Sequence, residues 1–155
     1  MPRTFTVSTQ YRVGVDDVFA AFADQRYWLE RLADSGADAA TLDSMTIATD
    51  GGINVTTTQC IHHSRLPGLA AQFHSGDLEL VRSEKWSAIR SGASHAEVTG
   101  RVLRAPAKLT GEAVLEPADA GCILRFSGTV QVDIPLVGGR IESFVGAQLA
   151  ELMTA

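Results

Sequence analysis

The sequence contains no run of lysine or arginine, and its 18 acidic residues outnumber its 13 basic ones, giving a formal net charge of −5 at pH 7. Proteins that bind nucleic acid or anionic membrane surfaces need basic patches, so both classes are disfavoured. No stretch approaches the roughly 18 consecutive apolar residues of a membrane span. The first residues also lack the apolar segment of a signal peptide, so neither feature is expected.

Cysteine is equally scarce. Cys60 and Cys122 are the only two, they lie far apart, and neither belongs to a CxxC motif. This excludes a disulfide scaffold and favours a reducing, cytoplasmic setting with both thiols free. Cys60 has His62 two residues away as a conceivable base, but a single cysteine on a strand is more often a small core residue.

Metal-binding patterns are also missing. The four histidines, His62, His63, His74 and His95, form no HxH or HExxH motif and no spaced cysteine–histidine set. A zinc site needs three or four converging ligands, whereas His62 and His63 would point to opposite faces of an expected strand. We therefore expect no metal and no cofactor.

What the sequence does have is a regular order of patterns across 155 residues, a length that predicts one domain, 1–155. Residues 3–12 alternate apolar and polar side chains, which indicates a strand. Two short helices should follow, with Asp16 or a neighbour as first cap, because apolar residues then recur three and four apart. The break between these helices should lie near Asp24-Gln25.

The remainder is predominantly β. Asp50-Gly51-Gly52 is a tight-turn signal between residues 38–49 and 53–61, and short breaks separate 77–88, 95–103, 107–116 and 122–133. Short connections favour an antiparallel meander. From Pro135 a stripe of apolar residues predicts a long amphipathic helix, which must bury that stripe against the concave face of the sheet.

Three segments carry a family resemblance: Tyr11 to Phe22, Glu84-Lys85-Trp86, and the run from Gly128 to Glu142. With them the chain resembles the DUF2505 family of the START/Bet v 1-like (SRPBCC) superfamily. The resemblance implies an α+β helix-grip fold, in which a curved seven-stranded antiparallel sheet wraps around a long C-terminal helix and two short helices follow the first strand. It also implies a pocket between sheet and helix, since superfamily members bind lipids, sterols, polyketides and hormones.

Candidate ligand contacts lie on two expected strands. Arg82 and Glu84 share a strand face with Leu80 and Trp86, and Trp86 is expected inside. A buried arginine–carboxylate pair there would orient a polar ligand head group. The alternatives are that this strand has flipped its pattern or that the pair is a partly solvated salt bridge. Likewise Thr57 and Gln59 share a face with apolar residues, either as cavity groups or at a solvent-exposed strand end.

The remaining candidates are Phe126, Phe144 and Gln148. The aromatic rings suit either a cavity lining or a filled core. Gln148 interrupts the apolar stripe of the expected C-terminal helix, and a buried amide is costly unless it is hydrogen-bonded. We hypothesise that Phe144 and Gln148 border a void opposite Leu80, Arg82 and Phe126. In the alternative, Gln148 lies at the edge of the stripe and reaches solvent.

Three functions fit these patterns. The first is a binding protein for a hydrophobic small molecule or lipid, with a cavity between sheet and C-terminal helix. The second is a polyketide cyclase-like enzyme using acidic and basic pocket residues, although no catalytic residue can be assigned. The third is an interaction scaffold with a filled core. The ligand, the pathway and the oligomeric state, monomer or homodimer, stay open.

Overall fold

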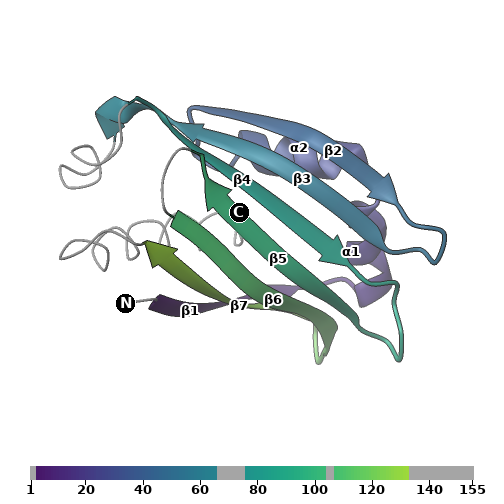
Figure 1. Ribbon diagram of the computed structural model, residues 1–155. Coiled ribbons are helices and arrows are strands. Elements are labelled where there is room, and N and C mark those ends of the chain that lie inside the picture. Colours follow the sequence, from purple (N-terminus) through teal and green to yellow (C-terminus); the bar gives the residue numbers. More distant parts are fainter. Residues whose placement is uncertain (1–2, 66–75, 104–106, 133–155) are drawn as a thin grey trace.

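A computed structural model describes residues 3–65, 76–103 and 107–132. These residues form one antiparallel sheet and two helices (Figure 1). The elements in chain order are β1 (Arg3–Tyr11), α1 (Val15–Phe22), α2 (Gln25–Ala33), β2 (Ala39–Ile47), β3 (Ile53–Ile61), a 3₁₀ turn (His63–Arg65), β4 (Leu78–Trp86), β5 (Ser94–Val102), β6 (Ala107–Ala118) and β7 (Gly121–Val132).

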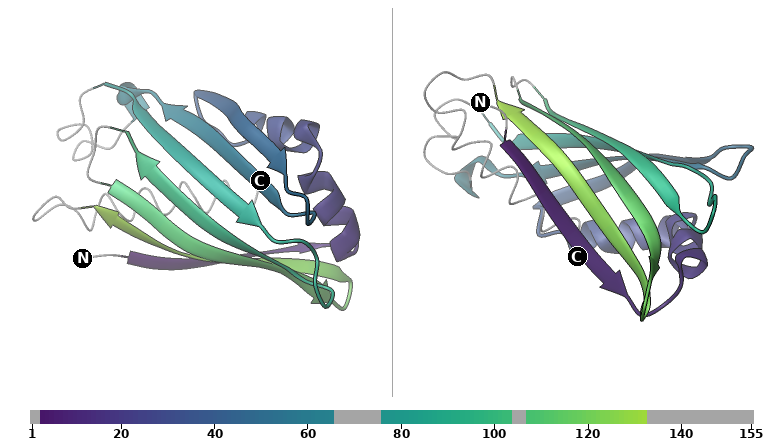
Figure 2. Two further views of the ribbon diagram at one scale, coloured as in Figure 1. Left: turned by 45° about the vertical axis from the view of Figure 1, so that its right-hand side comes forward. Right: turned by 90° about the horizontal axis from the view of Figure 1, so that it is seen from below.

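The sheet has the strand order β1-β7-β6-β5-β4-β3-β2, so β1 and β2 form its two edges. Successive strands from β2 to β7 pair with their chain neighbours, as the short breaks predicted. The sheet is strongly curved, and α1 and α2 carry the chain from one edge to the other along one end (Figures 1 and 2). The predicted seven-stranded sheet with two short helices is therefore confirmed.

Two local predictions need correction. Helix α1 begins after Gly14 rather than after Asp16, because the Asp17 carboxylate accepts the backbone N–H of Gly14 and so closes the first turn. His62 and His63 do not continue a strand, because β3 ends at Ile61 and His63 starts the 3₁₀ turn. By contrast, the expected break between the helices is confirmed, since the Asp24 carboxylate caps α2 through the N–H of Arg26.

The expected C-terminal helix, with Phe144 and Gln148, lies outside the described residues, as does His74. Neither α1 nor α2, the helices in the described part, is long and apolar enough to cross a membrane.

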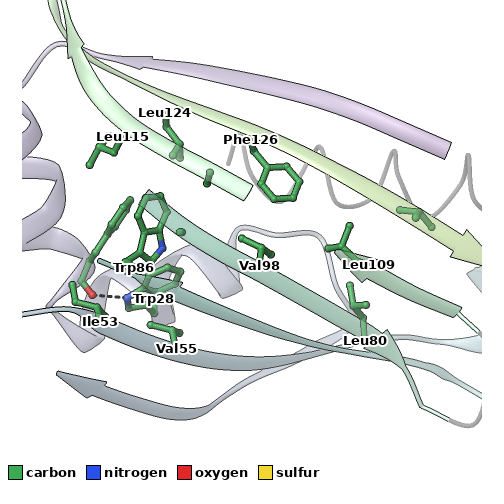
Figure 3. Packing of buried hydrophobic residues seen from close by; sticks show 14 of the residues in the cluster. Trp28, Ile53, Val55, Leu80, Trp86, Val98, Leu109, Leu115, Leu124 and Phe126 are labelled. Atoms are coloured by element: carbon green, nitrogen blue, oxygen red, sulfur yellow. Dashed lines mark hydrogen bonds between the residues drawn. The ribbon is translucent and has the colours of Figure 1, made fainter. Parts of the chain in front are cut away.

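The concave face of the sheet carries the apolar core. Alternate residues of β3 to β7 are buried, and their side chains point to the same side of the sheet (Figure 3). Trp86 is 1% exposed, which confirms that it lies inside. Its ring packs against Phe22 of α1, with ring centroids 4.9 Å apart. Trp28 is fully buried beside them and donates its indole N–H to the Phe22 carbonyl at 2.7 Å.

Two paired glycines leave room on the concave face for the ring of Phe126. Gly111 of β6 and Gly128 of β7 face each other in the sheet. A Cβ atom on Gly128 would lie 2.8 Å from the Phe126 ring, and one on Gly111 would lie 2.9 Å from it. The ring therefore occupies the space that two side chains would otherwise fill.

Candidate functional site

Four polar side chains interrupt the apolar concave face. Thr57 and Gln59 come from β3, and Arg82 and Glu84 come from the adjacent β4. The strand register places Thr57 directly opposite Arg82, with Glu84 diagonally next to Thr57. All four are buried: Thr57 is 1% exposed, Gln59 3%, Arg82 2% and Glu84 2%. We call these four residues the polar stripe.

The ion pair of the polar stripe is buried. Arg82 Nη2 lies 3.3 Å from Glu84 Oε2, and both side chains are almost fully enclosed. The other carboxylate oxygen, Oε1, accepts the indole N–H of Trp86 at 3.4 Å. The alternative of a partly solvated salt bridge is therefore wrong. Burial lowers the pKa of the Arg82 guanidinium, because desolvation disfavours the charged form, and the charge of Glu84 opposes this effect.

Several polar atoms of the stripe have no hydrogen-bond partner in the described part of the chain. They are Thr57 Oγ1, both amide atoms of Gln59, and Glu84 Oε2, which lies near Arg82 without hydrogen-bonding geometry. The alternative of a solvent-exposed strand end for Thr57 and Gln59 is wrong, since both are buried. Buried polar groups are nearly always hydrogen-bonded, so this concentration of unpartnered atoms makes the polar stripe a candidate binding site.

The apolar candidates border the stripe. Leu80 faces Gln59 across the two strands, and Trp86 follows Glu84 on the same strand face. Phe126 lies farther along the concave face, on β7, and is buried like the other two. Figure 3 shows all three pointing to the same side of the sheet. The structure thus places every candidate within the described residues on one face.

A second buried cation, Arg31 of α2, escaped the sequence reasoning. It is 6% exposed and lies over the ring faces of Trp28, 5.5 Å from the centroid, and Tyr27, 6.0 Å from it. Arg31 also donates to the Tyr27 hydroxyl at 3.4 Å. The sequence spacing could have predicted its burial, because Arg31 lies three residues after Trp28 and next to Leu32, on the buried face of α2.

Tyr11, an aromatic residue that suits either a cavity lining or a filled core, lies near the same cluster. It ends β1 and is half-buried beside Tyr27 and Arg31. Burial and the neighbouring Tyr27 raise the pKa of the Tyr11 hydroxyl to about 12, above its ordinary value of 10. The shift arises because burial disfavours the charged form of the hydroxyl.

Cys60 does not have the surroundings of a nucleophile. Its sulfur lies 4.0 Å from Asp77 Oδ2, and burial together with nearby carboxylates raises the pKa of the thiol. An activated cysteine needs the opposite shift. The thiols of Cys60 and Cys122 are both free, and β4, β5 and β6 separate the strands that carry them. Among the described residues no group of three potential ligands could hold a metal ion.

The opposite face of the sheet carries a groove of about 470 Å³ near the β2–β3 turn. Its polar side chains include Lys85, His95, Glu97 and Glu112, all of them exposed to solvent. Because water already satisfies such groups, this groove lacks the buried unpartnered atoms that distinguish the polar stripe.

The sequence matches the model of a family described as "Protein of unknown function (DUF2505)" over residues 6–155. The chain belongs to this family. Uncharacterized proteins of Mycobacterium tuberculosis (strain H37Rv) and Mycobacterium bovis are each 39% identical to it over 160 residues. These alignments cover 99% of this chain and 92% of each relative. This chain and these two relatives therefore align over nearly their whole lengths.

Solved structures show the same fold at low sequence identity. A protein from Thermus thermophilus is 12% identical with a TM-score of 0.59, covering 97% of this chain and 89% of that one. A START superfamily protein from Mycobacterium smegmatis is 11% identical with a TM-score of 0.51, covering 98% and 91%. Ara h 8.0201 is 15% identical with a TM-score of 0.51, covering 98% and 95%. The DUF2505 chain thus has a START/Bet v 1-like fold.

Proposed function

We propose that this protein binds a hydrophobic small molecule or lipid over the concave face of the sheet. One observation carries the proposal: buried polar atoms without partners interrupt an otherwise apolar face. Ligand sites have this composition, because apolar walls supply affinity and a few polar groups fix orientation. The apolar part of the ligand would lie toward Leu80 and Phe126, and its polar end would lie at the polar stripe.

The START-like fold supports binding in general, since the same architecture is shared with the START superfamily protein named above. Two free cysteines suit a reducing compartment, so we place the activity in the cytoplasm. A cyclase-like enzyme would need a proton-transfer group free to act on the ligand. Within the described residues Glu84 contacts both Arg82 and Trp86, and the three described histidines lie on exposed positions. Binding without chemistry therefore fits the site better.

The test combines native mass spectrometry with titration of an apolar fluorescent probe. The purified protein should carry or accept a small apolar molecule, and Phe144→Trp should report its arrival by a change in emission. Leu80→Gln should weaken probe binding by roughly tenfold, because it removes apolar contact from the concave face. Val81→Gln is the matched control, because Val81 follows Leu80 on β4 and its side chain points to the opposite face of the sheet. This substitution should leave probe binding unchanged.

Failure of this proposal is readily recognised. If neither wild type nor Phe144→Trp binds the probe, and no small molecule is released from the native protein, the concave face is a filled core. The interaction scaffold would then be the better description of the protein.

A further inference from the structure

We infer that the polar stripe selects a ligand whose buried end is an uncharged hydroxyl group, an alcohol or a phenol, and discriminates against a carboxylate. The inference rests on the proposed function and specifies the chemistry of the ligand. It is drawn from the kinds of atom that lack partners among the described residues, rather than from the apolar part of the face.

The unpartnered atoms include both donors and acceptors. Gln59 Nε2 only donates, whereas Gln59 Oε1 and an ionised Glu84 Oε2 only accept. Thr57 Oγ1 can do either. A hydroxyl group both donates and accepts, so it can satisfy atoms of both kinds.

The register makes these atoms neighbours. Thr57 and Gln59 are successive residues on the inner face of β3, and Glu84 lies diagonally across from Thr57 on β4. Diagonal neighbours of this kind have Cα atoms roughly 7–8 Å apart, within reach of long side chains. A small polar group lying across the stripe therefore meets side chains from both strands.

A carboxylate suits this set poorly. It offers acceptors alone, so Gln59 Oε1 and Glu84 Oε2 would stay unsatisfied, and its charge would lie beside that of Glu84. Arg82 already forms an ion pair with Glu84 at 3.3 Å. Arg31, the second buried cation within the described residues, lies on the rings of Trp28 and Tyr27 in α2. Arg31 would attract the carboxylate, whereas Glu84 would repel it and two acceptors would lack a donor. The experiment below measures which of these effects is larger.

The experiment compares three ligands with the same chain: dodecan-1-ol, dodecanoate and dodecyl methyl ether. The ether accepts a hydrogen bond but cannot donate one. Displacement of the fluorescent probe from wild type should require roughly tenfold less dodecan-1-ol than dodecanoate or ether, which corresponds to about one hydrogen bond.

Gln59→Leu provides a second and independent readout. Removing a buried amide without partners should raise the melting temperature of the ligand-free protein by roughly 2–4 °C, because the desolvation cost disappears. The same variant should lose part of the preference for dodecan-1-ol over the ether, because Gln59 no longer pairs with the hydroxyl group while Glu84 Oε2 still accepts from it. Gln10→Leu is the matched control, since Gln10 is exposed on β1, and it should change neither quantity in this way.

The outcomes separate the two claims. If none of the three ligands displaces the probe, the proposed function fails. If dodecanoate binds more tightly than dodecan-1-ol, binding stands and the hydroxyl inference is overturned. A lowered melting temperature for Gln59→Leu also overturns it, since the amide would then be hydrogen-bonded within the fold.

Discussion

Burial changes how much an ion pair contributes to stability, and this chain contains a buried pair and a solvent-exposed pair that can be compared. Arg82 and Glu84 are enclosed on the concave face, whereas Arg125 and Glu116, 3.5 Å apart on β7 and β6, are exposed to solvent. Water weakens the exposed attraction and hydrates each partner separately. A buried charge has no such substitute, so loss of one partner leaves the other in an apolar environment.

We therefore expect Glu84→Gln to lower the free energy of unfolding by about 3–5 kcal/mol, because the Arg82 guanidinium loses the countercharge beside it. Glu116→Gln should cost less than about 1 kcal/mol, since its partner stays hydrated. Urea unfolding of both variants measures the difference. Equal effects of the two substitutions would show that the Arg82–Glu84 pair contributes no more than a surface pair.

At the scale of secondary structure, the two faces of the sheet have different compositions. On the convex face, one residue from each strand forms a continuous row of hydroxyl side chains. The register gives the row as Thr4, Thr129, Thr110, Thr99, Ser83, Thr56 and Ser44. Two adjacent pairs lie at hydrogen-bonding distance, Thr4 with Thr129 and Thr56 with Ser83, each at 3.2 Å. Such cross-strand pairs stabilise a sheet while keeping its outer face polar.

On the concave face, the packing of Phe126 over Gly128 yields a prediction. Gly128→Ala should lower the free energy of unfolding by about 1–3 kcal/mol, because its Cβ would lie 2.8 Å from the ring. Gly100→Ala is a graded control with a smaller cost, since the nearest atom to its Cβ is a Leu109 carbon at 3.3 Å.

Combining Gly128→Ala with Phe126→Leu supplies the decisive comparison, measured by thermal or urea unfolding. The double variant should be more stable than the sum of the single effects predicts, because the smaller side chain vacates the space that the new Cβ needs. Strict additivity would contradict direct contact between ring and glycine.

At the scale of the whole molecule, strand order decides which residues can meet. Cys60 of β3 and Cys122 of β7 are separated by β4, β5 and β6. Four steps of about 4.8 Å place them roughly 19 Å apart, and a disulfide requires Cα atoms within about 7 Å. Thr4 and Thr129, although 125 positions apart in sequence, lie side by side.

Non-reducing mass analysis should therefore show no loss of two hydrogens in the wild type. A Thr4→Cys, Thr129→Cys variant should lose two hydrogens under mild oxidation and return them on reduction. A cross-link between the native cysteines instead would contradict the strand order.

Local sequence patterns predicted the order of the described elements, because hydrophobic periodicity and turn residues are local properties. Residues 53–61 were predicted as the second arm of a hairpin and form β3, although His62 and His63 were expected to continue it, and the period of two placed Trp86, Arg82 and Glu84 on one face. The antiparallel meander followed from short connections. Local chemistry placed the start of α1 less exactly, since Gly14 is its N-cap, while Asp17, a neighbour of the predicted Asp16, accepts the backbone N–H of Gly14.

Which polar residues are buried on the concave face, and which side chains they meet there, depends on the packing of distant segments against one another. The sequence allowed two interpretations of Thr57 and Gln59, as cavity groups or as a solvent-exposed strand end. Alternation assigns residues to a face of the sheet without showing whether water reaches that face. Arg31 of α2 is buried like Arg82 and Glu84. Burial lowers the pKa of Arg82, and Arg31 lies close enough for its charge to lower that pKa further. This proximity depends on contacts between residues that are distant in the chain, so no local sequence pattern predicts it. The same long-range contacts bury the four residues of the polar stripe and make them a candidate site.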